Sequence, residues 1–148
     1  MIKIKKPYKI TTFESGPMAN FIYLIEDIAS KKCALIDPAW NLTEIFEYIQ
    51  QKSLSLERIL LTHSHNDHVN AIDEVLNDYD VPININHDEH VFWGKKYDNF
   101  DLNYGGDLIY LGDTVIKCIH TPGHTPGSTC YYIDDDLIAG DTLFVFGC

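Results

Sequence analysis

The sequence predicts an α/β fold on three observations. Strand-like stretches open the chain, strands then alternate with helices, and a run of strands closes it. The chain has 148 residues, which suits one domain with a buried core. Hydrophobic residues make up 45% and charged residues 22%, as is ordinary for a globular protein. No linker, repeat or low-complexity segment divides the chain, so we expect a single domain over residues 1–148.

The first part of the chain predicts three strands and a helix. The strands are expected over 8–13, 20–26 and 32–36, and the third is apolar and ends in a turn at Asp37-Pro38. The segment Asn41-Leu42-Thr43-Glu44 resembles a capping box that starts a helix. The apolar residues that follow it recur at helical spacing, at Leu42, Ile45, Phe46 and Ile49.

The second part predicts further alternation and then strands alone. A short buried strand is expected over 59–62, a helix over 68–79, a strand over 82–86 and a short helix over 87–93. The polar and aromatic stretch 94–105 is typical of a loop. Four strands are then expected over 107–111, 114–120, 129–133 and 137–139, with turns between them.

Composition excludes several classes of function. The formal net charge of −11 argues against a general grip on nucleic acid. No apolar run approaches the roughly 20 residues that cross a bilayer, and no apolar segment follows the basic N-terminus. We therefore expect a cytoplasmic protein with no membrane and no nucleic acid as partner. Cys33, Cys118 and Cys130 are expected as buried thiols, although a Cys118–Cys130 pair stays open.

A dense histidine cluster follows the apolar run 59–61. His63 and His65 are two residues apart in an extended segment, so both imidazoles project to the same side and can reach one ion. Asp67 and His68 fall where the chain turns into a helix and could hold a second ion. Carboxyl ends of strands are where open α/β sheets place ligands. Imidazole mixed with a carboxylate suits Zn, Fe or Mn.

Two later segments add candidate ligands. The segment 121–128, T-P-G-H-T-P-G-S, has two Pro-Gly steps that constrain the backbone around His124. Read alone His124 could be a plain loop residue, but beside the cluster we expect it to bind metal. His120 is expected to be structural or to support the metal ligands without binding the ion. Asp141 follows a strand in G-D-T-L-F, which by itself indicates only a turn.

Together, the three segments resemble motifs of the metallo-β-lactamase superfamily, and most of all its glyoxalase II-like branch. The motifs H-x-H-x-D-H, T-P-G-H-T-P-G-S and G-D-T-L-F occur in the same order, and the resemblance runs from about residue 10 to the last residue. It implies an αββα sandwich. It further implies a first metal on His63, His65 and His124, a second on Asp67 and His68, and a bridging Asp141. Asp37 would support the metal loop.

The chain departs from that pattern at its end. It stops at Cys148, seven residues after Asp141, where members of the superfamily usually continue. We therefore expect an incomplete metallo-β-lactamase-like domain whose C-terminal part is missing. The second metal site would lack a histidine, and one apolar sheet face would be exposed. A homo-oligomer could complete the fold.

The resemblance implies a metal-dependent hydrolase, and most strongly a glyoxalase II-like one that cleaves a small-molecule thioester with a metal-bound hydroxide. Binding to a metal lowers the pKa of water to about 7, from about 15.7 in bulk. Asp67 would act as the catalytic residue by orienting the hydroxide. The expected cofactor is zinc, as one or two ions, with Fe or Mn as alternatives. Asp141, where the best-known β-lactamases use cysteine, makes β-lactam hydrolysis less favoured.

Two other functions stay open. One is a persulfide dioxygenase-like enzyme with a single iron on His63, His124 and Asp141. The other is a metal-binding fragment without turnover. Elsewhere, His87 and His90 are expected on the surface. Three aromatic residues are expected to pack against one another more than to line a substrate cleft: Trp93, Tyr97 and Phe100.

Overall fold

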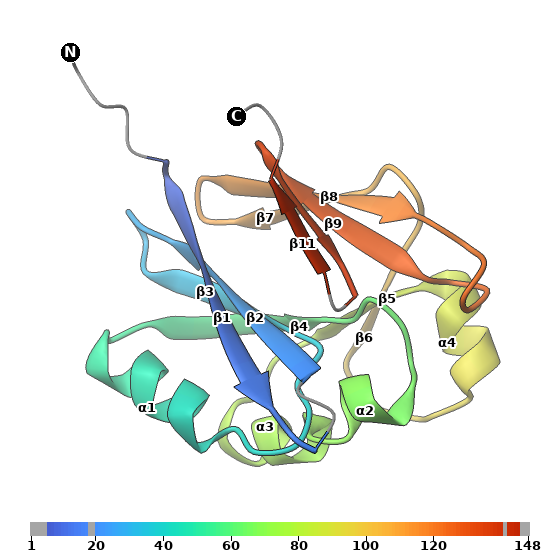
Figure 1. The fold of residues 1–148 in the computed structure, drawn as a ribbon, viewed down its shortest axis with the longest axis horizontal. Helices are drawn as coiled ribbons and strands as arrows, with labels where there is room; N and C mark the ends of the chain where they lie inside the picture. The colour runs from blue at the N-terminus through green and yellow to red at the C-terminus, as the bar shows by residue number, and fades with distance from the viewer. Residues whose placement is uncertain (1–5, 18–19, 141, 146–148) are drawn as a thin grey trace.

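A computed structural model describes residues 6–17, 20–140 and 142–145. Figure 1 shows two β-sheets that face each other, with helices on the outer side of the first sheet. The order of elements confirms the predicted α/β class. Each sheet is built from one continuous part of the chain, so the contact between them joins the N-terminal and C-terminal halves.

Within the described residues, the first sheet has six strands in the order in which they occur along the chain. Its first three strands pair antiparallel and the following ones pair parallel. The strands are β1 (Tyr8–Ser15), β2 (Asn20–Asp27), β3 (Lys32–Ile36), β4 (Ser55–Leu60), β5 (Ile83–Asn86) and β6 (Phe100–Asn103). The parallel strands β3, β4 and β5 therefore end at the same edge, which is the edge at which the histidine cluster follows β4.

The second sheet has five antiparallel strands in the part of the chain that the structure describes. These are β7 (Leu108–Leu111), β8 (Thr114–His120), β9 (Thr129–Ile133), β10 (Asp136–Ala139) and β11 (Thr142–Val145). The loop between β8 and β9 carries His124. It emerges from the second sheet near α4, as Figure 1 shows.

Among the residues described, four helices lie between the strands of the first half: α1 (Thr43–Gln51), α2 (Asn66–Val69), α3 (Ile72–Asp78) and α4 (His87–Trp93). The apolar sides of α1 and α3 pack on one face of the first sheet, through residues such as Ile45, Ile49, Ile72 and Val75. A second apolar cluster fills the space between the sheets. Each cluster removes apolar surface from water, which is the main favourable contribution to folding.

Polar bonds between the sheets reinforce this packing next to the histidine cluster. The Tyr131 hydroxyl donates to the Leu61 carbonyl oxygen at 2.6 Å, and the Thr129 N–H donates to the Thr62 carbonyl oxygen at 2.8 Å. Both bonds end on the residues directly before His63. The second sheet therefore holds the start of the metal-ligand candidate loop from the opposite side.

Several sequence predictions about the elements were wrong. The capping box expected over 41–44 is not formed, because the N-cap of α1 is Leu42, which makes no side-chain cap bond. The strand expected over 59–62 lies at Ser55–Leu60. The stretch 94–105, expected as a loop, contains β6, which pairs parallel with β5 at the sheet edge. The helix expected over 68–79 is broken into α2 and α3. Asn70 Oδ1 accepts the Trp40 N–H at 2.6 Å and the Ala71 N–H donates to the Pro38 carbonyl at 3.2 Å, so this break is tied to the loop after β3.

The outer face of the second sheet carries exposed apolar side chains, including Leu108 and Tyr110, and among the described residues no helix packs on it (Figure 1). Three of the four layers of an αββα sandwich are thus formed by the described part of the chain. None of the helices described has the length and apolar content that a membrane crossing needs.

The three described cysteines are free thiols, so the open Cys118–Cys130 pairing is not formed. Burial raises the pKa of Cys33 and of Cys118 to about 12, with smaller contributions from nearby carboxylates. Cys130 is only partly buried, which corrects the expectation that all three are buried.

Candidate functional site

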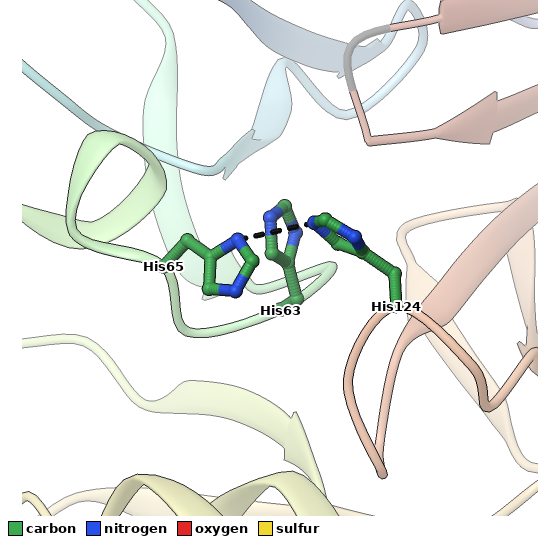
Figure 2. A group of neighbouring side chains, drawn as sticks. All are labelled: His63, His65 and His124. Carbon is green, nitrogen blue, oxygen red and sulfur yellow. Dashed lines mark hydrogen bonds between the residues drawn. The ribbon is translucent and has the colours of Figure 1, made fainter.

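Three histidine side chains from two separate loops converge at one end of the sheets. His63 and His65 lie in the extended segment between β4 and α2, and His124 lies in the loop between β8 and β9. One ring nitrogen of each lies within 4.8 Å of the others. His65 Nδ1 and His124 Nε2 are 3.1 Å apart, and Figure 2 shows the three rings turned toward a common point.

The donor set suits a divalent metal ion. Tetrahedral zinc with Zn–N bonds of about 2.0–2.1 Å separates its ligand atoms by roughly 3.3 Å. The spacing of the His65 and His124 nitrogens is close to this value. His63 Nδ1 is 2.9 Å from Thr62 Oγ1, which orients the ring with Nε2 as its other nitrogen. Burial is the main cause of a lowered pKa at His63. The nearby Asp37 acts to raise this pKa, and the neighbouring histidines lower it further. His63 is therefore neutral at pH 7, the form that binds metal.

Asp37 anchors a second group next to the first. Asp37, His63 and His68 also place ligand atoms within 4.8 Å of one another. Asp37 Oδ2 is 3.0 Å from His68 Nδ1, and Asp37 Oδ1 accepts the Thr62 N–H at 2.8 Å. Asp37 has a φ of 55°, a left-handed conformation that aspartate tolerates better than most residues. Asp37 thus orients His68 and the residue before His63 together.

Asp67, the expected catalytic residue, is held by a side chain that sequence reasoning missed. Asn20 Nδ2, at the start of β2, donates to Asp67 Oδ2 at 3.0 Å and to the Asp67 carbonyl oxygen at 2.8 Å. The Asn20 bond lowers the pKa of Asp67, against the opposing effect of burial. Asp67 is therefore ionised at neutral pH. Its Oδ2 lies 3.7 Å from His68 Nε2, so the Asp67 and His68 side chains lie next to each other.

Glu89 was also missed. This fully buried carboxylate on α4 accepts hydrogen bonds from Ser64 and Gly127, which lie on the two histidine-bearing loops. Burial by itself would raise the pKa of Glu89, but bonds from Ser64, Thr125 and Gly127 outweigh it and leave the pKa lowered. In the sequence, Glu89 lies in the polar run 86–90, where no pattern distinguishes it from a solvent-exposed acidic residue.

A cavity of about 820 Å³ opens over the histidines. Asp67 and His68 line it, as do Trp40 and Cys130, which the sequence did not indicate. Its volume lies within the range of roughly 300–1,000 Å³ that small-molecule sites occupy. The cavity can therefore bring a small substrate against the converging imidazoles.

Other candidate residues lie elsewhere. Asp141, the expected bridging ligand, lies outside the described residues. His120 Nε2 is 2.9 Å from the Pro126 carbonyl oxygen, which fits the structural role expected for it. His87 stacks on Tyr104, away from the cavity lining. The rings of Trp93, Tyr97 and Phe100 contact one another and are not part of that lining, so they pack rather than line the cleft.

Comparison with known proteins gives one family match and several relatives. The model of the metallo-beta-lactamase superfamily matches residues 15–148. PksB of Bacillus subtilis, a probable polyketide biosynthesis zinc-dependent hydrolase, is 33% identical over 97% of this chain and 63% of its own length. The cytoplasmic isozyme of hydroxyacylglutathione hydrolase from Saccharomyces cerevisiae is 36% identical over 92% of this chain and 52% of its own length.

One solved structure has a similar fold. ETHE1 from Myxococcus xanthus superimposes with a TM-score of 0.71 at 25% identity, covering 87% of this chain and 55% of ETHE1. The chain thus spans between half and two thirds of the length of these relatives.

Proposed function

Because the chain belongs to the metallo-beta-lactamase superfamily, we propose that it acts in the metal-dependent hydrolysis of a small-molecule thioester. The observation that carries this proposal is the convergence of His63, His65 and His124 on one point beside a cavity. In the proposal these three residues hold a first ion, and Asp67, His68 and Asp141 contribute to a second. Zinc is the ion proposed, because imidazole and carboxylate ligands suit it and a relative is named as zinc-dependent.

The side chains have distinct tasks in this proposal. A bound divalent ion lowers the pKa of water to about 7 and polarises a carbonyl group. His63, His65 and His124 present ring nitrogens from two loops and thereby set where the reaction takes place. Asp67 is ionised and accepts a hydrogen bond from Asn20, so its carboxylate can orient the attacking water or accept its proton. Asp37 keeps His68 turned in one direction.

The thioester part of the proposal is supported by the relatives. Hydroxyacylglutathione hydrolase is the name of the yeast relative and of several bacterial ones, at 32–36% identity. An acyl-glutathione is a thioester, so we propose this class of substrate for the present chain. A cytoplasmic location belongs to the same proposal, since the yeast relative is named as the cytoplasmic isozyme.

Metal analysis combined with a thioester assay tests the proposal. The protein is expected to bind zinc and to hydrolyse S-lactoylglutathione at neutral pH. His124→Ala removes one of the three converging nitrogens and should lower turnover about 100-fold or more, since even residues that only support metal ligands contribute 10–100-fold. His87→Ala, which removes a histidine outside the cavity lining, is the matched control and should stay within about twofold of the original activity.

Three results would contradict the proposal. A single bound iron with oxygen uptake on glutathione persulfide would favour a dioxygenase-like function. Tight metal binding with no turnover of any thioester would favour a binding function without catalysis. Equal losses in His124→Ala and His87→Ala would mean that the histidine cluster is not the reaction site.

A further inference from the structure

We propose that Glu89 is the positioning residue that holds the two histidine-bearing loops in register, so that His65 and His124 reach the same ion. This role rests on the metal site of the proposed function. Glu89 lies on α4, on neither ligand loop, and it does not line the cavity. It therefore acts through the loops and does not touch the substrate.

The carboxylate of Glu89 has one oxygen for each loop. Oε2 accepts the Ser64 N–H at 2.8 Å and the Ser64 hydroxyl at 2.6 Å, and Ser64 stands between His63 and His65. Oε1 accepts the Gly127 N–H at 3.0 Å, three residues after His124. Thr125, the residue next to His124, also bonds to Glu89 through its hydroxyl. A single rigid group thus links segments that lie more than 60 residues apart in sequence.

Close packing fixes Glu89 in this position. Its side chain is fully buried. A Cβ on Gly127 would lie 2.2 Å from the Glu89 backbone nitrogen and 2.5 Å from the Glu89 Cβ, so the second loop rests directly against α4 and needs glycine there. Asn86 Oδ1 caps α4 by accepting the Asp88 N–H at 2.8 Å. The start of α4, the Glu89 carboxylate and the loop at Gly127 are therefore held in fixed positions relative to one another.

The bonding pattern requires a carboxylate. Every partner of Glu89 on the two loops is a donor, and among the ion pairs of the described residues none includes Glu89. A glutamine would direct an amide N–H group at the donors of one loop or the other. Glu89→Gln should therefore loosen one loop while changing the shape of the side chain little.

Asp27 provides a matched control for a merely structural role. It is also fully buried and hydrogen-bonded, accepting from Ser30 and, at 2.6 Å, from the Thr114 hydroxyl of the second sheet. Asp27 ends β2, whereas the start of β2 bears Asn20 beside Asp67. The eight-residue strand separates them by about 23 Å. Asp27→Asn should lower the unfolding free energy without changing the positions of the histidines.

The experiment measures metal affinity in the absence of any substrate. Zn²⁺ binding to the protein, Glu89→Gln and Asp27→Asn is measured by competition with a chromophoric chelator, and the visible spectrum of the Co²⁺-loaded protein reports ligand geometry. Glu89→Gln should bind Zn²⁺ 10–100-fold more weakly and alter the Co²⁺ spectrum. Asp27→Asn should keep both the affinity, within about twofold, and the spectrum.

Affinity of Glu89→Gln within about twofold of the original, with an unchanged spectrum, overturns the proposal, and so does an equal loss in Asp27→Asn. If Glu89→Gln does not fold, Ser64→Ala decides, because it removes one bond to Glu89 and leaves the carboxylate in place. About 3–10-fold weaker binding then supports the role, and unchanged binding overturns it. A protein that binds zinc but cleaves no thioester contradicts the proposed function alone.

Discussion

Replacing Asp37 by asparagine tests whether a buried hydrogen bond sets which His68 nitrogen can bind metal. The Asp37 side chain is buried, with Oδ1 accepting the Thr62 N–H at 2.8 Å and Oδ2 facing His68 Nδ1 at 3.0 Å. A carboxylate only accepts hydrogen bonds, so it favours a proton on Nδ1 and leaves the lone pair on Nε2, the nitrogen nearer Asp67. Asparagine would set an N–H group against His68 or against the Thr62 N–H.

The expected magnitudes follow from these contacts. One hydrogen bond to a charged group is lost or reversed, so the metal-free protein should lose about 1.5–3 kcal/mol of unfolding free energy. If the N–H group faces His68, the tautomer with a proton on Nε2 is favoured and metal binding at His68 is opposed. The affinity for the second zinc ion, the one that His68 helps to hold, should then fall 10–100-fold, equivalent to about 1.4–2.8 kcal/mol.

Urea unfolding of the metal-free protein and zinc titration of the folded protein measure the two effects separately. Asp27→Asn serves again as the control, because it should reduce stability and leave affinity unchanged. If Asp37→Asn bound zinc within twofold of the original protein, the orientation of His68 by Asp37 would be refuted as a determinant of binding.

Three further predictions concern the contact between the sheets, pH and metal removal. Tyr131→Phe removes the bond to the Leu61 carbonyl and should lower the unfolding free energy, measured in urea, by about 1–2 kcal/mol. Tyr132→Phe on the exposed face is the control and should change it by no more than about 0.5 kcal/mol. Equal effects of the two variants would contradict the role of that bond. The pKa of Glu89 is lowered from its ordinary 4.5, so its contribution to stability is present above about pH 4.5 and is lost as the pH falls below that value. The unfolding free energy, measured from pH 3 to 7, should therefore depend less on pH in Glu89→Gln than in the original protein. Parallel curves for the two proteins would contradict this. Removing zinc with a chelator should lower the unfolding free energy by about 2.7 kcal/mol if the free zinc concentration was 100 times its Kd. The loss is measured as a lower Tm. An unchanged Tm would mean that the folded state holds no ion.

Much of the fold could be predicted because most elements carry a strong local pattern. The strands at 32–36, 114–120 and 129–133 and the helix at 87–93 occur at the predicted residues. The strand β6 was missed because Phe100–Asn103 has only four residues and is defined by its pairing with β5. The break between α2 and α3 was missed because Asn70 and Ala71 bond to the distant loop at 38–40, which no helical periodicity reveals.

The candidate site divides in the same way. His63, His65, Asp67 and His68 could be found from six residues of sequence, since their density has few structural explanations. Of the residues that orient them, Asp37 was expected from the family resemblance, and the others could not be found. Asn20 is 47 positions from Asp67, and Glu89 is 25 positions from Ser64 and 38 from Gly127. Their roles exist only once the sheets and α4 are packed together, and as types they are common on exposed surfaces.

The central claim is that three histidines from two loops bind one ion. It is tested most directly by an anomalous difference map, recorded at the zinc absorption edge, from crystals of the protein grown with zinc. We predict a peak about 2.0–2.1 Å from one nitrogen of each of His63, His65 and His124. A map without a peak among these three side chains, or with zinc only at other residues, would contradict the account.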